Sequence, residues 1–181
     1  VTSASKNLKS NKTMQRLYFL MLILLATLQM NAAEKPSKEY YQITVYHYKT
    51  ADQEKILDNY FEKALIPALH KINLKNIGVF KSLANDTAAD KTLFVFVTIK
   101  SPNEVAIIES KINADADYQT AGAAYINTDY KSPVYSRKEV IIAEAFPLAP
   151  KMKLPQLKSA KNERVYELRS YESVSEKIFA N

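Results

Sequence analysis

Residues 40–48, with the sequence YYQITVYHY, alternate in character and are rich in β-branched and aromatic side chains. This pattern is typical of a β-strand, in which successive side chains point to opposite faces. One face is predicted to carry Tyr41, Ile43, Val45 and His47, and the other Gln42, Thr44, Tyr46 and Tyr48.

Residues 50–72 have the apolar spacing of an amphipathic helix. Thr50 and Gln53 form a capping-box sequence at its start, with a hydroxyl at the cap and an amide three residues on. The buried face is predicted to carry Leu57, Tyr60, Phe61, Ala64, Leu65, Leu69 and Ile72. Because Pro67 lacks an N–H and clashes with the preceding turn, the helix is predicted to kink between Lys63 and Pro67.

Two more strands are predicted, at residues 76–83 and 92–99, with a polar turn at 85–91 between them. Gly78 indicates a bulge or a close backbone approach within the first of these strands. The second strand, TLFVFVTI, is apolar on both faces and is therefore predicted to be central and covered on both sides.

A helix is predicted to start at Ser101-Pro102-Asn103-Glu104, with Ser101 as the cap and Glu104 closing a capping box. Its buried stripe is Val105, Ile108 and Ile112. A second short helix is predicted within 115–127, which is rich in alanine, and a fourth strand at 135–146. The proline-rich residues 147–162 are predicted to be a linker.

The order strand, helix, strand, strand, helix, strand over residues 40–146 predicts an α+β, ferredoxin-like βαββαβ domain. Such a domain carries its helices on one face of the sheet. The other face of the sheet must then be covered by another part of the protein or serve as a binding surface.

The N-terminal segment predicts export. Residues 14–33 combine a cationic start at Arg16, an apolar run of 12 residues from Leu17 to Leu28 and a small-residue end, which is the pattern of a signal peptide cleaved after Ala33. The run is too short to span a bilayer, so no stable membrane span is expected after cleavage, although an uncleaved anchor stays the alternative. Residues 1–13 are interpreted as translation upstream of Met14, and 34–39 as a polar leader. The expected location is the periplasm or the cell exterior.

Charge and composition exclude several classes. The net charge is +6, but four of the 25 cationic residues and none of the 19 acidic ones fall within residues 1–33, which leaves 21 against 19. This near-equal number of cationic and acidic residues argues against nucleic-acid binding. The absence of cysteine excludes a disulfide framework, a thiolate zinc site and a cysteine nucleophile.

Residues 163–181 look like the start of a second copy of the domain. Within ERVYELRSYE, the residues Tyr166, Leu168 and Tyr171 match Tyr41, Ile43 and Tyr46 at one constant offset. The interpretation is a second repeat that is truncated here. One extra C-terminal strand and helix is the alternative.

The segments YYQITVYHY, KNIGVFKSL, DADYQTAGAAYIN and VYELRSY resemble the NIPSNAP family, and in particular its bacterial, exported, two-repeat members. The resemblance covers the chain from Tyr40 onward. It implies a protein of the dimeric α/β-barrel type, in which two ferredoxin-like units put their open sheet faces together. The expected partner is therefore a second NIPSNAP-like repeat or another subunit.

No motif for a known chemistry is complete. The two glycines cannot build a nucleotide loop, no serine has the flanking glycines of a nucleophile elbow, and metal-ligand motifs are missing, so no metal or cofactor is expected. The candidate ligand-binding residues are Thr44, Tyr46, His47, Tyr48 and Arg137. Thr44, Tyr46 and Tyr48 are expected on the sheet face opposite the helices, where they would line a cavity or pack at an interface. No catalytic residue is assigned.

Two functions follow as hypotheses. The first is a non-catalytic binding or interaction module of the NIPSNAP type, exported from a bacterial cell. The alternative is a small cofactor-independent enzyme, similar to an oxygenase or isomerase, in which Tyr46, His47 and Arg137 would hold a small aromatic or apolar molecule; it rests on fold analogy alone. That alternative requires polar groups, not apolar ones, on the face opposite the helices.

Overall fold

The computed structural model describes residues 14–21 and 37–179. It consists of two compact units, Val1–Lys151 and Met152–Asn181, which are described separately. Residues 14–21, the start of the expected signal peptide, are helical. The rest of that peptide, the upstream segment 1–13 and half of the leader lie outside the described residues. Within the described ranges, no helix combines the length and the apolar content needed to cross a membrane.

The sheet has four antiparallel strands in the order β2-β3-β1-β4. They are β1 (Tyr40–Tyr48), β2 (Ile77–Lys81), β3 (Lys91–Ile99) and β4 (Arg137–Glu144). The central strand β1 pairs with β3 from Tyr40 to Tyr48 and with β4 from Tyr40 to His47. This strand order, with a helical crossover after β1 and another after β3, is the ferredoxin-like topology that the sequence predicts. The observed β2 and β4 are shorter than predicted.

The first crossover is a continuous helical segment with a change of pitch. It comprises α2 (Ala51–Tyr60), the π-helical turn η1 (Phe61–Leu65) and α3 (Ile66–Lys71). The predicted capping box is present, since Gln53 N donates to Thr50 Oγ1 over 3.2 Å and Thr50 N donates to Gln53 Oε1 over 3.1 Å. The predicted irregularity before Pro67 takes the form of this π turn, which leaves room for the proline ring.

The second crossover contains α4 (Glu104–Asn113), α5 (Ala116–Ala121) and α6 (Ala123–Ile126). The predicted Ser101 cap is wrong: the N-cap is Asn103, and it makes no side-chain capping bond. The cause is a tight first turn, in which Glu104 N donates to the carbonyl of Ser101. The Glu104 carboxylate reaches back and accepts from Lys100 N instead, over 2.7 Å.

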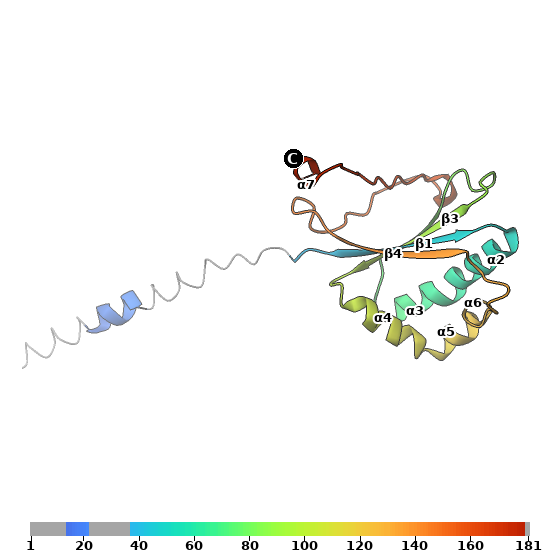
Figure 1. Ribbon diagram of the computed structural model, residues 1–181. Helices are drawn as coiled ribbons and strands as arrows, with labels where there is room; N and C mark the ends of the chain where they lie inside the picture. Colours follow the sequence, from blue (N-terminus) through green and yellow to red (C-terminus); the bar gives the residue numbers. More distant parts are fainter. Residues whose placement is uncertain (1–13, 22–36, 180–181) are drawn as a thin grey trace, which may run out of the picture. The chain divides into compact units, whose positions relative to one another are not determined.

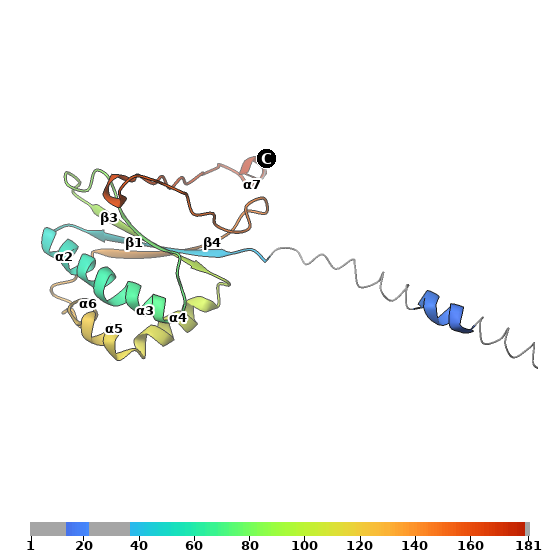
Figure 2. The same cartoon turned by 180° about the vertical axis from the view of Figure 1, so that it is seen from behind.

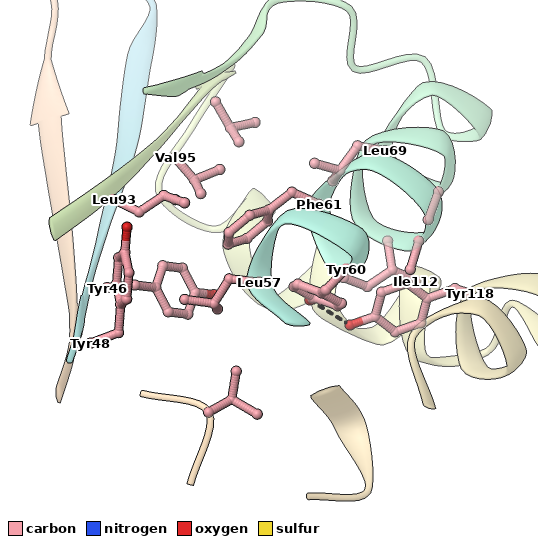
Figure 3. Close-up of a cluster of buried hydrophobic side chains, with 14 of the residues drawn as sticks. Tyr46, Tyr48, Leu57, Tyr60, Phe61, Leu69, Leu93, Val95, Ile112 and Tyr118 are labelled. Carbon is pink, nitrogen blue, oxygen red and sulfur yellow. Dashed lines mark hydrogen bonds between the residues drawn. The ribbon is translucent and has the colours of Figure 1, made fainter. Parts of the chain in front are cut away.

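All helices from α2 to α6 lie on one side of the sheet, as the sequence predicts (Figures 1 and 2). The core fills the space between the two layers (Figure 3). Its fully buried members include Tyr48, Leu57, Phe61, Leu93 and Ile99. At the β2 side, Lys81 contacts Glu54 over 2.5 Å and Asp58 over 2.8 Å, which ties the edge strand to α2.

Gly122, between α5 and α6, permits a close approach of these helices to the first crossover. A Cβ at this position would lie 2.8 Å from the Tyr118 carbonyl oxygen and 3.3 Å from the Ala64 Cβ. The alanine-rich segment therefore packs closely, as predicted. Gly78 makes no bulge, because β2 keeps regular pairing with β3; its missing side chain instead makes room for the Phe80 ring.

The second unit has little regular structure. It contains a 3-10 turn, Lys161–Glu163, and a four-residue helix α7, Glu176–Phe179. Residues 164–172, predicted to repeat β1, form no strand. A strand requires a hydrogen-bonded neighbour, and within the described residues these positions are not paired with another strand. The likeness of this segment to β1 stays a prediction.

The capping of α2 gives a direct stability test. Thr50→Ala removes the Oγ1 acceptor and is expected to lower the free energy of unfolding by about 1 kcal/mol in urea titrations. Ser101→Ala is the matched control, because the Ser101 side chain does not cap α4, and it is expected to leave stability nearly unchanged. Equal losses in the two variants would contradict this assignment of the caps.

Candidate functional site

The register of the sheet shows that the five candidate residues do not form one site. Thr44, Tyr46 and Tyr48 point toward the helices and are 5%, 3% and 0% exposed. The expectation that they lie on the opposite face is wrong. The alternation along β1 establishes only that they share a face, and their apolar rings and methyl group are buried under the helix layer, where their hydroxyls find partners.

His47 and Arg137 lie on the other face, directly opposite each other in the β1–β4 register. Both are engaged in ion pairs. His47 Nδ1 is 2.8 Å from Asp90 Oδ2 and His47 Nε2 is 3.3 Å from Glu139 Oε1, while Arg137 Nε is 2.9 Å from the same Glu139 oxygen. This four-residue charged cluster marks one end of the sheet and is separated from Tyr46 by the sheet itself.

The remainder of the face opposite the helices, called the open face below, is largely apolar. The strand registers place on it Tyr41, Ile43 and Val45 of β1, Phe80 of β2, Phe94 and Phe96 of β3, and Ile141 of β4. The rings of Tyr41 and Phe96 stack with centroids 5.3 Å apart. The alternative hypothesis expected convergent polar groups on this face, and among the described residues named here the polar groups are those of the cluster around His47.

A pocket of about 610 Å³ lies on the helix side, between the sheet and the second crossover. Its walls include Val105, Ile108 and Ile112 of α4 and Leu65 and Leu69 of the first crossover. We call it the tyrosine pocket, because six tyrosines line it: Tyr46, Tyr60, Tyr118, Tyr125, Tyr130 and Tyr135.

Two hydroxyl pairs organise the tyrosines. Tyr60 and Tyr118 share a hydrogen bond of 2.9 Å between their hydroxyls (Figure 3), and the Tyr125 hydroxyl donates to the Tyr46 hydroxyl over 3.3 Å. The Tyr60 and Tyr125 rings stack with centroids 3.8 Å apart, and Tyr135 packs edge-on against Tyr46 at 5.5 Å. The rings therefore hold one another in a fixed arrangement.

Burial keeps the hydroxyls of Tyr46, Tyr60 and Tyr125 protonated. Desolvation raises the pKa of Tyr46 and of Tyr60 far above the ordinary tyrosine value. Desolvation also raises the pKa of Tyr125 to about 12. At neutral pH these three tyrosines are therefore neutral hydrogen-bonding groups and do not act as bases.

Two polar residues of β1 form the floor of the pocket. Gln42 Nε2 donates to Thr44 Oγ1 over 3.3 Å, and both side chains line the cavity. At one side the Lys138 ammonium lies 5.7 Å from the centre of the Tyr46 ring. Among residues 14–21 and 37–179, no cluster of three or more histidine, aspartate or glutamate side chains has a geometry suited to a metal ion.

Sequence reasoning identified Thr44 and Tyr46 but missed most of the pocket. Tyr118 and Tyr125 lie within the alanine-rich segment that predicts a short helix, and Tyr60 was assigned to a buried helix face, so none of the three was a candidate. Gln42 carried a usable signal, since it shares a face with Thr44 and Tyr46 on a central strand, and an amide in such a position is uncommon unless it has a polar partner.

No family model matches the chain. No curated protein matches it either. Among solved structures, the chain is similar to a NIPSNAP domain protein from Burkholderia xenovorans at 11% identity and a TM-score of 0.46, covering 62% of this chain and 99% of that one.

A second similar structure is a NIPSNAP-like domain protein, also from Burkholderia xenovorans, at 15% identity and a TM-score of 0.47, covering 68% of this chain and 97% of that one. A third is an ethyl tert-butyl ether d (ethd) family protein from Bacillus halodurans, at 14% identity and a TM-score of 0.37, covering 60% and 99%. None reaches a TM-score of 0.5, so the strand order described above defines the fold as ferredoxin-like. The first two come from the family that the sequence resembles.

The raised tyrosine pKa values predict how stability depends on pH. An unfolded tyrosine ionises near pH 10, whereas burial raises the pKa of Tyr125 and of Tyr48 to about 12. Because the folded state holds these protons more tightly, their contribution to stability is complete below pH 10 and is lost as the pH rises toward 12. Urea unfolding at a series of alkaline pH values measures this loss.

The alkaline loss is expected to be smaller in Tyr125→Phe, which has no hydroxyl to ionise. Tyrosinate absorbance of the folded protein provides the control, because the buried hydroxyls should ionise only together with unfolding. Ionisation of all tyrosines at the ordinary value, while the chain stays folded, would contradict the burial described above.

Proposed function

We propose that this chain is a NIPSNAP-type interaction module, exported from a bacterial cell, that pairs the open face of its sheet with the equivalent face of a second ferredoxin-like unit. The second unit is another subunit, or a second repeat of a longer protein. The observation that supports the proposal is the composition of the open face, because aromatic and aliphatic side chains from all four strands share it. At β4 this face is accessible, since Ile141 is 46% exposed, whereas Val45 near the centre is already buried.

The chemistry of the open face fits such a partner. A sheet face rich in Phe, Ile and Val gains free energy when it is removed from water, at about 25 cal/mol per Å² of apolar area. Sheets pack on one another about 10 Å apart through interdigitating side chains of this type. The charged cluster of His47, Asp90, Arg137 and Glu139 at one end supplies directionality, since a misplaced partner would bury unpaired charges.

The size of the face can be compared with that of known interfaces. The strands β1, β2, β3 and β4 contain 9, 5, 9 and 8 residues. At about 3.4 Å per residue and about 4.8 Å between strands, they give a projected surface of roughly 500 Å². Stable protein interfaces bury about 800 Å² of accessible surface on each partner, so the proposed pairing must also include surface beside the sheet.

A non-catalytic role is favoured by the way the polar groups are used. Arg137 is paired with Glu139, the His47 ring contacts Asp90 and Glu139, and Tyr46 and Tyr60 stay protonated. Neither set offers the pairing of a poised base with a nucleophile that covalent or acid–base catalysis needs.

Export is proposed from the sequence of residues 14–33, with its cationic start, apolar run and small-residue end. When the full chain is produced in a Gram-negative bacterium, the mature protein is expected in the periplasmic fraction with Glu34 as its first residue. Replacing Leu24 in the apolar run by arginine should block this processing. Unprocessed protein in the cytoplasm of the unsubstituted strain would contradict the proposal.

Pairing of the open face can be tested by two neighbouring substitutions on β4. Ile141 lies on the open face and is 46% exposed, whereas Val140 lies on the helix side and is 50% exposed. Sedimentation velocity over a concentration series is expected to give a dimer for the unsubstituted chain and for Val140→Lys. Ile141→Lys is expected to be monomeric, because the ammonium would be buried in the interface.

Circular dichroism and urea titration of both variants check that each one folds. If the unsubstituted chain is a monomer at every concentration, the pairing proposal is contradicted. A dimer that persists in Ile141→Lys would contradict it as well.

A further inference from the structure

We propose that the tyrosine pocket binds one uncharged aromatic molecule that carries a hydroxyl or carbonyl oxygen. This site lies on the helix side of the sheet and does not depend on the pairing of the open face. Four features of the pocket carry the inference: its size, its aromatic walls, two buried hydroxyl protons without protein acceptors, and the balance of its charges.

Size and walls set the general class of ligand. A pocket of about 610 Å³ falls within the range of small-molecule sites. Its walls combine aliphatic side chains of α4 with the tyrosine rings. Aromatic rings prefer to pack against other rings in offset or edge-to-face arrangements, so a flat aromatic molecule gains the most contact here.

The floor of the pocket supplies hydrogen-bond donors. The Tyr46 hydroxyl accepts from Tyr125, and the Thr44 hydroxyl accepts from Gln42. Within the described part of the chain, no further hydrogen bond of either hydroxyl is found. The Thr44 proton, and the one proton of the Tyr46–Tyr125 pair that the bond between them does not use, are therefore left for an acceptor inside the pocket. Both residues are more than nine-tenths buried, and a buried donor without a partner is costly. An oxygen atom on the ligand satisfies these donors.

The charges of the lining and the donors on the floor favour an uncharged ligand. The charged side chains around the pocket are one cation, Lys138, and two carboxylates, Glu109 and Asp129. An anionic ligand would therefore enter an environment that is negative on balance. A cationic ligand would meet the Lys138 ammonium, which already faces the Tyr46 ring, and would bring no acceptor for the hydroxyl protons.

Three compounds that share the naphthalene ring test separately the need for an oxygen atom and the need for an uncharged ligand. 2-Naphthol is uncharged at neutral pH and carries a hydroxyl, naphthalene lacks the oxygen, and 2-naphthoate is an anion. Binding to the full chain can be followed by quenching of protein emission, which comes from tyrosine alone because the chain has 12 tyrosines and no tryptophan. 2-Naphthol is expected to bind more tightly than either of the other two.

Tyr46→Phe and Tyr48→Phe form a matched pair of variants. Both tyrosines lie on the helix side of β1 and are buried, but only Tyr46 lines the pocket; the Tyr48 hydroxyl accepts from Asn85 Nδ2 over 3.0 Å. Tyr46→Phe is expected to weaken 2-naphthol binding roughly five- to tenfold and to leave naphthalene binding unchanged. Tyr48→Phe is expected to bind both probes as the unsubstituted chain does.

Each of the other outcomes overturns the proposal. Equal binding of naphthalene and 2-naphthol would remove the role of the oxygen, and tight binding of 2-naphthoate would remove the requirement for an uncharged ligand. Absence of binding by all three probes would reject the site. Loss of 2-naphthol binding in Ile141→Lys, with Tyr46→Phe unaffected, would place the binding on the open face instead. Thr44→Val, which keeps the shape of the side chain, provides a second test if Tyr46→Phe fails to fold.

Discussion

The structure depends on the alternation of side chains along β1, the central strand of the sheet. Because β1 is hydrogen-bonded on both sides, its backbone is fixed, and each side chain is assigned to one face with no freedom to change. Gln42, Thr44 and Tyr46 are thereby committed to the helix side, and Ile43, Val45 and His47 to the open face. A shift of pairing by one residue would exchange these sets and destroy the core and both surfaces at once.

Most of the fold could be predicted from sequence because its signals are local. The capping box at Thr50 and the irregularity before Pro67 act within a few residues of chain, and both are found as expected. The apolar run of β3 correctly predicts an inner strand, but the helices cover only one of its faces, so the predicted cover on both sides is wrong for the helix layer. Ser101 shows the limit of such reasoning. Its sequence context fits a cap, but the chain closes a tight turn first, and the helix begins beyond the reach of its hydroxyl.

The site was harder to predict because its members meet only through the fold. The alternation of side chains along β1 correctly places Thr44 and Tyr46 on the same face, but it does not reveal which face the helices will cover. Tyrosine compounds the difficulty, since a ring with one hydroxyl suits an exposed interface and a buried pocket equally well. The pairs Tyr60–Tyr118 and Tyr46–Tyr125 join residues 58 and 79 positions apart, and no periodicity in the sequence connects them.

The central claim is that one sheet serves two purposes on two separate faces. Methyl NMR with a soluble paramagnetic probe tests it most directly, because isoleucines lie on both sides of the sheet. The account predicts that dilution exposes the methyl groups of Ile43 and Ile141 to the probe without affecting Ile108 and Ile112, and that 2-naphthol shifts only Ile108 and Ile112. If dilution and 2-naphthol perturb the same methyl groups, the two faces do not act separately and the account is contradicted.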